Sequence, residues 1–310
     1  MDGVLLIDKP TGMTSHDTVA KLRKILGQRR VGHTGTLDPE AEGLMIICLG
    51  RATKIARFVS DFDKTYEAEI CLGRVSSTYD REGVDLKQEP QPVPELSEAD
   101  LAKLLDGFSG RIRQKVPAYS AVHIDGERLY KLARAGVEVD APEREVEIKE
   151  IALSYYREPM LFVTVTCSKG TYIRSLAHDI GQKVGCGGYL SKLRRTAVGN
   201  MTIDCALTLE SVALHHQQQS LSEHLVSYDN LLGFPAFVLS EEFQPMVVTG
   251  RDLSAKDVVR VEGDFAPGDR VFLKSLQGDP LAVGTAEVPA NAVSEIENGT
   301  RLFSYIRVLN

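Results

Sequence analysis

The 310-residue chain is long enough for two domains, because one domain takes about 150 residues. Its shares of hydrophobic residues (43%) and charged residues (25%) are ordinary for a globular protein, and nothing in the composition calls for a collagen-like, coiled-coil or disordered chain. The net charge of −7 argues at first against a nucleic-acid partner, but the distribution of charge matters more than its sum.

The first half of the chain alternates between strand and helix patterns. Residues 4–7 have the pattern of a short buried strand, and Thr14 or Ser15 is the expected N-cap of a helix that Gly27 ends. The further predicted elements are, in chain order, a strand over 44–49, a helix over 51–59, an alternating strand over 64–72, a surface loop over 85–98, a helix from the capping box of Ser97 and Asp100 to Phe108, and a helix over 126–135 closed by Gly136.

The second half changes character near its end. Paired strands are predicted over 146–156 and 160–166, a helix over 170–184, and a helical stretch with a polar middle over 208–232. After Gly233 the strands become short, and Pro and Gly turn signals separate them, which predicts an all-β domain of roughly 70 residues. We therefore predict two domains, over residues 1–235 and 236–310.

The cysteines and the apolar runs indicate the cellular compartment of the protein and argue against a zinc site and a membrane-spanning segment. None of the five cysteines lies in a Cys-x-x-Cys pair, so a zinc site is not expected, and the odd number fits a reducing cytoplasm. The longest apolar runs, such as residues 44–49, are too short to cross a bilayer, and the start of the chain has no basic leader. We expect a cytoplasmic protein with no membrane partner.

Basic residues gather in two places despite the acidic sum. Residues 1–60 carry nine Lys or Arg against six Asp or Glu, a local balance of +3, and residues 192–195 include three more Lys or Arg. Each run is equally consistent with a solvated helix or loop face. An acidic protein with basic stripes can nevertheless hold a polyanion along one track.

The strongest candidate for a catalytic segment is residues 31–39, with the sequence Val-Gly-His-Thr-Gly-Thr-Leu-Asp-Pro. Gly32 and Gly35 permit backbone conformations that other residues avoid, and Pro39 biases Asp38 towards an extended conformation. The expected result is a tight loop that holds one carboxylate in a fixed position. The Gly-Lys-Ser/Thr ending of a phosphate-binding P-loop is missing, and an ordinary turn with a capping aspartate explains the segment equally well.

Together with Gly43, this segment resembles the catalytic motif of the TruB family of tRNA pseudouridine synthases. Further blocks resemble the family in the same order along the chain, and they are Gly3–Pro10 with Thr14–His16, Lys64–Tyr66, Val116–Ala121, Ser168–Leu176 and Leu193–Arg195. The tail from about residue 236 is similar to a PUA domain, an RNA-binding module, through Gly268–Val271 and Ala282–Gly284.

The resemblance implies three catalytic residues. Asp38 matches the catalytic aspartate, and Arg174 matches the arginine that pairs with it. Tyr66 matches the tyrosine proposed to handle a proton and to pack on the base. Arg174 also lies near the start of a predicted helix, where a cation gains nothing from the helix dipole, so it calls for an anionic partner.

The resemblance also implies how the substrate is bound. Tyr172 and Leu193 match residues that line the uracil pocket, His33 matches a histidine where the target base leaves the stack, and Lys9 matches a lysine near the active site. The implied fold class is α+β, a catalytic core with a mixed, largely antiparallel sheet and flanking helices. An insertion at about 122–145 is expected to grip the RNA arm.

The implied reaction fits these residue types. Pseudouridine formation breaks the bond from ribose C1′ to uracil N1 and joins C1′ to C5. No group or electron leaves the molecule, so no redox or metal cofactor is expected. The step needs an ionised Asp38, which burial disfavours and a nearby Arg174 favours. The base must also be flipped out at a cost of a few kcal/mol, which stacking on Tyr66 and Tyr172 offsets in part.

Three other functions remain open from the sequence. A hydrolase of N-glycosidic bonds would pair Asp38 with Glu40 or Glu42 and release free uracil. A tRNA-binding or tRNA-folding protein would keep its effect without Asp38. A guide-RNA-dependent pseudouridine synthase of ribonucleoprotein particles shares the Asp38 motif and a PUA-like tail, but the brief N-terminus and the lack of a basic tail favour a stand-alone enzyme. We expect a monomer without an obligatory protein partner that modifies uridine 55 in the T-arm of tRNA.

Overall fold

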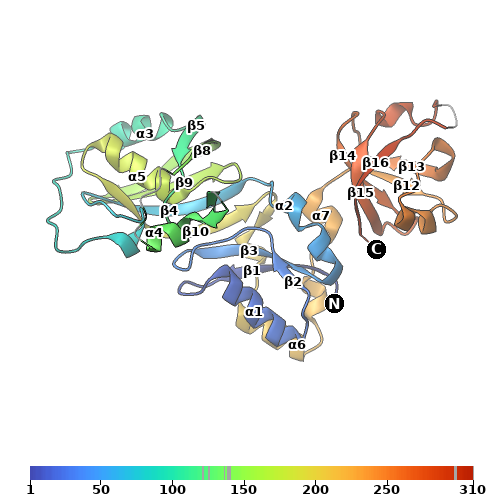
Figure 1. The fold of residues 1–310 in the computed structure, drawn as a ribbon, viewed down its shortest axis with the longest axis horizontal. Coiled ribbons are helices and arrows are strands. Elements are labelled where there is room, and N and C mark those ends of the chain that lie inside the picture. Colours follow the sequence, from blue (N-terminus) through green and yellow to red (C-terminus); the bar gives the residue numbers. More distant parts are fainter. Residues whose placement is uncertain (121, 125, 136, 138–140, 297–298, 310) are drawn as a thin grey trace.

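The structure is a computed structural model that describes residues 1–120, 122–124, 126–135, 137, 141–296 and 299–309. Two β-sheets organise the chain, and the smaller one, drawn in orange and red, lies at one end of the molecule (Figure 1). The nine strands of the larger sheet are β1 (Gly3–Lys9), β2 (Val31–His33), β3 (Glu42–Leu49), β4 (Lys64–Leu72), β5 (Gly110–Lys115), β8 (Glu143–Arg157), β9 (Met160–Cys167), β10 (Gly188–Val198) and β11 (Met201–Thr202).

The larger sheet brings distant segments together at its centre. Its order is β1-β3-β10-β4-β9-β8-β5, with β2 paired to β3 and β11 paired to β10. Among the described strands, β3 and β10 run parallel and the other pairs of this sheet run antiparallel. The expected mixed, largely antiparallel sheet is therefore confirmed. A separate hairpin joins β6 (His123–Ile124) to β7 (Glu127–Arg128).

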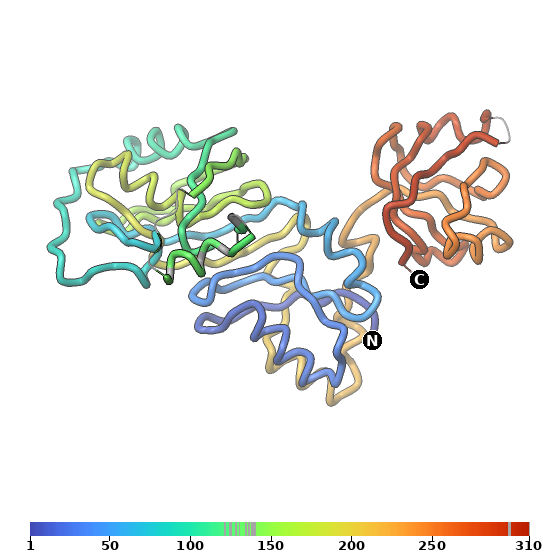
Figure 2. The backbone as a smooth tube through the Cα atoms, viewed as in Figure 1, coloured from blue at the N-terminus to red at the C-terminus, as the bar shows by residue number. Residues whose placement is uncertain are grey.

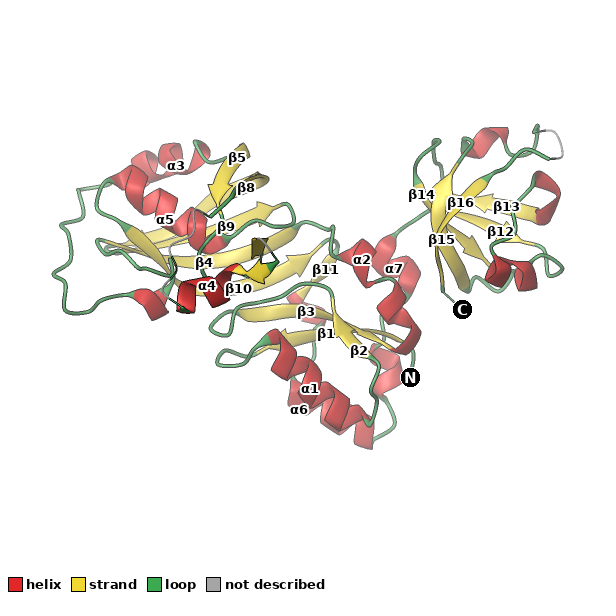
Figure 3. Ribbon diagram, in the orientation of Figure 1, coloured by secondary structure: helices red, strands yellow, loops and turns green. Residues whose placement is uncertain are grey.

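Helices cover the larger sheet in two groups (Figure 3). The helices are α1 (Ser15–Leu26), α2 (Ala56–Val59), α3 (Glu98–Asp106), α4 (Leu129–Arg134), α5 (Ile173–Val184), α6 (Leu209–Gln217) and α7 (Tyr228–Leu232). Helices α3 and α5 contact the β8 and β10 part of the sheet, whereas α1 and α6 pack side by side near β1. No helix among the described residues is long and apolar enough to cross a membrane.

The C-terminal strands form a five-stranded sheet of order β13-β12-β14-β15-β16. They are β12 (Ala236–Leu239), β13 (Val258–Glu262), β14 (Arg270–Lys274), β15 (Pro280–Ala286) and β16 (Phe303–Val308). The expected small all-β C-terminal domain is therefore confirmed. Both chain ends lie near the junction of the two sheets (Figure 2). Asp2 and Leu309 line the same cavity there.

Alternation along β1 divides the apolar residues between two cores. Leu5 and Ile7 belong to the core that holds α5, while Val4 and Leu6 point to the other face, since successive strand side chains alternate. This second core also contains Phe58 and, from the C-terminal sheet, Phe272. The C-terminal domain is thus attached to the catalytic core through shared apolar packing as well as through the chain.

Local signals in the sequence placed several elements correctly. Thr14 and Ser97 both cap their helices through capping boxes, and Gly27 ends α1 with a φ of 60°. Strand β4 has the predicted bounds and buries alternate residues. The expected helix over 170–184 starts later, at Ile173, because Tyr172 is an extended N-cap.

Tertiary pairing altered three expected helices. The stretch 208–232 is broken between α6 and α7, where Val226 donates its backbone N–H to Val4. The stretch 51–59 begins as a 3₁₀ helix over Gly50–Lys54, and only Ala56–Val59 is α-helical. The stretch 126–135 first forms β7, so its helix starts at Leu129. The proposed stop at Gly136 lies outside the described residues, as does Ala121, the last residue of the Val116–Ala121 block.

Candidate active site

Asp38 lies in the connection between β2 and β3, and the start of α1 fixes this loop. The Ser15 hydroxyl donates to the Leu37 carbonyl at 3.0 Å and accepts from the Leu37 N–H at 2.8 Å. The Pro39 carbonyl accepts from the Gly12 N–H at 2.9 Å and from the Lys9 ammonium at 3.2 Å. The residues on either side of Asp38 are therefore held by bonds to the first fifteen residues of the chain.

Arg195 on β10 ties the two ends of this loop together. Its side chain is buried, and it donates to the Leu44 carbonyl from Nε at 2.7 Å and to the Gly35 carbonyl from Nη2 at 3.1 Å. Gly43 lies against the same strand with a φ of +106°, and a Cβ there would come within 2.3 Å of the Arg195 carbonyl oxygen. The glycine after the catalytic motif is thus required by the close approach of β3 to β10.

We expect Gly43→Ala to lower the free energy of unfolding by on the order of 3 kcal/mol, because the added methyl group meets backbone atoms that cannot rotate away. Gly185→Ala is the matched control, since Gly185 also has a positive φ (+94°) but open space around its Cβ position. Urea unfolding of both variants separates the two effects. Equal losses would show that backbone strain alone, rather than the contact with β10, makes Gly43 necessary.

Arg174, in the first turn of α5, lies between two carboxylates. Its Nε is 3.0 Å from Asp38 Oδ2, and its Nη1 is 3.2 Å from Asp80 Oδ2. The guanidinium also donates to the backbone carbonyls of Thr78 at 3.4 Å and Tyr119 at 3.1 Å. Its side chain is only 7% exposed, whereas that of Asp38 is 44% exposed because it opens onto a cavity. The anionic partner expected for Arg174 is therefore present twice.

Burial and neighbouring charges act in opposite directions on Asp38. Burial raises the pKa of Asp38, and the Asp80 carboxylate adds to this rise, while the Arg174 guanidinium and the Lys9 ammonium lower the pKa. The net direction is upward. Arg174 thus favours the ionised form of this carboxyl group, against the effect of burial and of Asp80.

One cavity of about 380 Å³ brings together five of the seven predicted site residues. Asp38, Tyr66, Tyr172, Arg174 and Leu193 all line it. Its volume falls in the range of small-molecule sites, so one nucleobase with its ribose fits. The residues that the sequence attributed to catalysis and to the uracil pocket therefore face the same space.

The two tyrosines differ in their surroundings. Tyr66 on β4 is packed in the core and only 9% exposed. Burial raises the pKa of its hydroxyl, and the Arg195 guanidinium opposes that rise. Tyr172 is fixed through its backbone, because the buried Gln114 side chain accepts from its N–H at 2.7 Å and donates to its carbonyl at 2.9 Å. The Arg144 guanidinium lies 5.3 Å from the centre of the Tyr172 ring. Both rings are thus in place before any base enters.

Lys9 and His33 lie outside the lining of this cavity. Lys9 is fully buried and donates to the carbonyls of Pro10 at 2.8 Å and Pro39 at 3.2 Å, so it supports the backbone next to Asp38. His33 on β2 is half-buried, its Nδ1 has no hydrogen-bond partner, and burial lowers its pKa. It lies five residues before Asp38 on the approach to the loop.

Two residues of this site, Asp80 and Lys64, were not predicted from the sequence. Asp80 follows Tyr79, whose φ of 65° turns the chain so that Asp80 meets Arg174, and no pattern in this loop marks it. Lys64 belongs to the Lys-Thr-Tyr block but had no assigned role. It lines the cavity, donates to the Ser60 carbonyl at 2.7 Å, and burial lowers its pKa to about 8.

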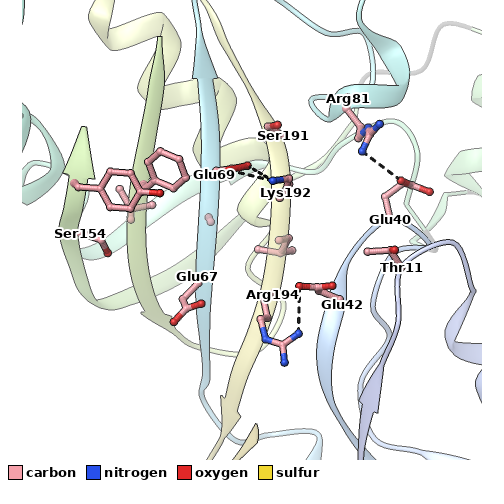
Figure 4. Close-up of a pocket in the computed structure, with 15 residues that line it drawn as sticks. Thr11, Glu40, Glu42, Glu67, Glu69, Arg81, Ser154, Ser191, Lys192 and Arg194 are labelled. Carbon is pink, nitrogen blue, oxygen red and sulfur yellow. Dashed lines mark hydrogen bonds and ion pairs between the residues drawn. The ribbon is translucent and has the colours of Figure 1, made fainter. Parts of the chain in front are cut away.

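Two further cavities bear on the hydrolase alternative. A cavity of about 30 Å³ lies between Asp38 and Glu40, which leaves room for water but not for a nucleobase. Glu40 and Glu42 also line a groove of about 730 Å³, where they pair with Arg81 at 3.8 Å and with Arg194 at 3.2 Å (Figure 4). Neither glutamate lines the cavity that holds Tyr66 and Tyr172, so the geometry does not support a hydrolytic pair there.

The 730 Å³ groove is larger than the candidate active site. Four glutamates, at positions 40, 42, 67 and 69, line it together with Arg81, Lys192 and Arg194, and each of these cations is paired with one of the glutamates (Figure 4). Glu67 and Glu69 alternate along β4 with Tyr66, so they point away from the candidate site. Among the described residues, no group of three or more His, Cys, Asp or Glu side chains is placed to hold a metal ion.

Family models match the chain over most of its length. The TruB family pseudouridylate synthase N-terminal domain matches residues 23–173, and the tRNA pseudouridylate synthase B C-terminal domain matches residues 174–233. The PUA domain matches residues 235–302. The first model includes Asp38 and Tyr66, and Arg174 is the first residue of the second.

Curated relatives agree with these matches. The chain is 40% identical to tRNA pseudouridine synthase B of Bacillus subtilis over 289 residues, which are 91% of this chain and 92% of that protein. It is 47% identical to tRNA pseudouridine synthase B of Bacillus velezensis over 247 residues, which are 78% of this chain and 80% of that protein.

Solved structures share the fold. The chain superposes with a TM-score of 0.75 and 22% identity on a chain in the crystal structure of the archaeal box H/ACA sRNP Nop10–Cbf5 complex, covering 99% of this chain and 86% of that one. A Cbf5–Nop10–Gar1 complex gives a TM-score of 0.76 and 24% identity over 99% of this chain and 85% of that chain. At this identity the likeness concerns the fold, including the C-terminal β-domain.

Proposed function

The chain belongs to the TruB family of pseudouridylate synthases, and from that premise we propose that it converts uridine 55 in the T-loop of tRNA to pseudouridine in the cavity lined by Asp38 and Arg174. As a tRNA pseudouridine synthase it is an isomerase. The observation that carries the proposed mechanism is the buried Arg174, which holds Asp38 at the wall of a cavity with two tyrosine rings.

In the proposed reaction, the target uridine leaves the base stack and enters this cavity. Unstacking costs a few kcal/mol, and the rings of Tyr66 and Tyr172 offset part of that cost by stacking on the base. His33 takes part where the base leaves the stack. The half-buried position of His33 and the neutral form favoured by its lowered pKa suit an apolar contact with the RNA.

In one path the ionised Asp38 bonds to C1′ as the bond from C1′ to N1 breaks, and in the other it assists removal of the C2′ proton as that bond breaks. The uracil then rotates within the cavity, and C5 joins C1′ as the bond to Asp38 breaks or as the proton returns to C2′. N1 gains a proton and C5 loses one, and in this proposal Tyr66, which lines the cavity and whose pKa burial raises, relays a proton. The cavity must also exclude water, because hydrolysis would lose the detached uracil.

Two parts of the chain are proposed to bind the rest of the RNA. The segment 122–145 grips the T-arm, and the C-terminal domain from residue 236 is an accessory RNA-binding domain. We propose that the enzyme acts in the cytoplasm without a guide RNA, a metal or an obligatory protein partner, as a monomer.

We expect the purified protein to modify an isolated T-arm stem-loop at a single uridine, because the residues of the cavity all precede residue 200. The measurement is mapping of pseudouridine in the stem-loop after incubation with the protein alone. Modification of ribosomal RNA but not of the stem-loop would contradict the proposed substrate, and a requirement for added guide RNA would contradict stand-alone action. Release of free uracil would favour hydrolysis.

A further inference from the structure

Three cations and two aspartates form a charged cluster beside the active-site cavity. Asp61 contacts the Lys169 ammonium through Oδ1 at 2.6 Å and the Arg270 guanidinium through Oδ2 at 3.0 Å. Asp63 contacts the Lys149 ammonium at 2.5 Å. These residues come from four segments, namely the loop before β4, strand β8, the loop after β9, and strand β14 of the C-terminal domain.

The cluster lies at the edge of the cavity. Lys169 itself lines the cavity, and so do Ser60 and Lys64, which flank the two aspartates in sequence. The Arg270 guanidinium is 5.4 Å from the centre of the Phe58 ring, in the apolar core that the two domains share, so its position is set by stacking as well as by charge. A nucleotide whose base enters the cavity leaves its phosphates at the rim of the cavity, and this edge of the rim carries cations that can bind them.

Stability alone does not account for these ion pairs. The side chains of Asp61, Lys169 and Arg270 are 34%, 63% and 41% exposed. Exposed pairs of this kind contribute about 0–1 kcal/mol, because water and salt screen the charges. A single carboxylate that holds two such cations is therefore displaced at small cost by another anion that can accept from both.

We propose that Lys169 and Arg270 form a binding site for a backbone phosphate next to the target uridine, and that Asp61 occupies this site in the free protein until the RNA phosphate displaces it. The inference rests on the proposed function, because it takes the RNA whose base enters the cavity as the ligand. Phosphate oxygens accept from Arg and Lys in the geometry that carboxylate oxygens use. Lys149, paired with Asp63, extends the same basic edge.

This arrangement gives the C-terminal domain a direct contact with the substrate. Arg270 belongs to the Gly-Asp-Arg-Val segment, which resembled a PUA motif, and it reaches across to the loop before β4. The chain carries a net charge of −7, which disfavours RNA binding in general. Asp61 occupies the two cations until a phosphate displaces it, so the site favours RNAs that bring a phosphate to this point over RNAs that do not.

The test is a binding titration with an unmodified tRNA transcript over a range of salt concentrations. Asp61→Asn should tighten binding roughly 3-fold to 10-fold at low salt. Lys169→Gln and Arg270→Gln should each weaken it by a similar factor and reduce the slope of log K against log salt by about 0.7–0.9, the value for one phosphate contact. In the Lys169→Gln/Arg270→Gln background, Asp61→Asn should have no further effect.

Asp252→Asn is the matched control, because Asp252 is an exposed aspartate paired with Arg301 at 3.2 Å in the C-terminal domain and its loss changes the net charge equally. Equal tightening by Asp61→Asn and Asp252→Asn, or unchanged salt slopes for Lys169→Gln and Arg270→Gln, would overturn the phosphate site. The binding readout is separate from catalysis. If the expected titrations are found but no pseudouridine forms in the T-loop, the proposed reaction fails while the phosphate site stands.

Discussion

Asp38→Asn is expected to lower the single-turnover rate of pseudouridine formation by several powers of ten while tRNA binding largely persists. Asparagine keeps the shape of the side chain and can still accept from Arg174, but it has neither the negative charge nor the nucleophilic oxygen. Removal of a group that acts covalently typically costs that much, as in subtilisin, where loss of the nucleophile costs roughly 10⁶.

Neighbouring carboxylates are not placed to replace Asp38. Asp80 lies across the Arg174 guanidinium, while Glu40 pairs with Arg81 and Glu42 with Arg194. RNA affinity should survive, because Lys and Arg contacts to phosphates supply most of it. Loss of one carboxylate near the polyanion is even expected to strengthen binding slightly.

The decisive measurement pairs single-turnover kinetics with a binding titration at fixed salt. A variant that turns over within tenfold of the parent would move the catalytic role away from Asp38. A variant that loses binding and activity together would instead indicate that Asp38 holds the loop in place. Thermal unfolding of the variant distinguishes this second outcome from loss of the whole fold.

Short-range signals in the sequence pointed to part of this site, and the ordered resemblance to a family decided the assignment. The Gly-rich loop and Pro39 mark Asp38, and the helix start marks Arg174 as a cation without a favourable dipole. These features depend on a few adjacent residues, and so they can be read without the fold. The capping residues Thr14 and Ser97 were predictable for the same reason.

Residues whose role depends on distant strands were not predictable. Strand β10 carries Lys192, Arg194 and Arg195, and the run of charge concealed a central strand. Arg195 is buried because it binds the Gly35 and Leu44 carbonyls, two acceptors about 150 residues away in sequence, which makes burial of its charge tolerable. No local pattern contains that information.

Asp80, in the candidate active site, was likewise not predictable from the residues around it in the sequence. Its loop shows no motif, and only the structure shows that the loop, through Tyr79, pairs with Leu190 of β10 and so reaches Arg174. The acid predicted from the sequence, through the resemblance to a family, was Asp38. The second acid, which shares the arginine, follows from the topology of the sheet.

Replacement of Arg174 should have the second large effect, and its signature is a change in pH dependence. Arg174→Met removes the cation between two carboxylates. Breaking a buried pair by removal of one partner costs about 3–5 kcal/mol, but the cost here should fall below that range, because Asp38 is 44% exposed. The variant should therefore fold, and its activity at neutral pH should fall by orders of magnitude.

The sign of the pH shift follows from the groups around Asp38. Activity needs ionised Asp38, so activity is present above the pKa of Asp38 and is lost as pH falls through it. Burial and Asp80 raise this pKa, and Arg174 lowers it. Arg174→Met should therefore move the acid limb of the rate profile to higher pH. Asp80→Asn removes a like charge and should move the acid limb to lower pH.

Single-turnover rates of the parent and both variants, measured at saturating enzyme from acidic to neutral pH, test this pair of shifts. Asp80→Asn is also expected to lower the plateau rate, because Arg174 loses an ion pair that helps to orient it. A purely structural role for Arg174 and Asp80 would lower the plateau in both variants and leave the acid limbs in place or shift them together. Opposite shifts are specific to an electrostatic role, since the two substitutions remove charges of opposite sign that act on the same carboxyl group.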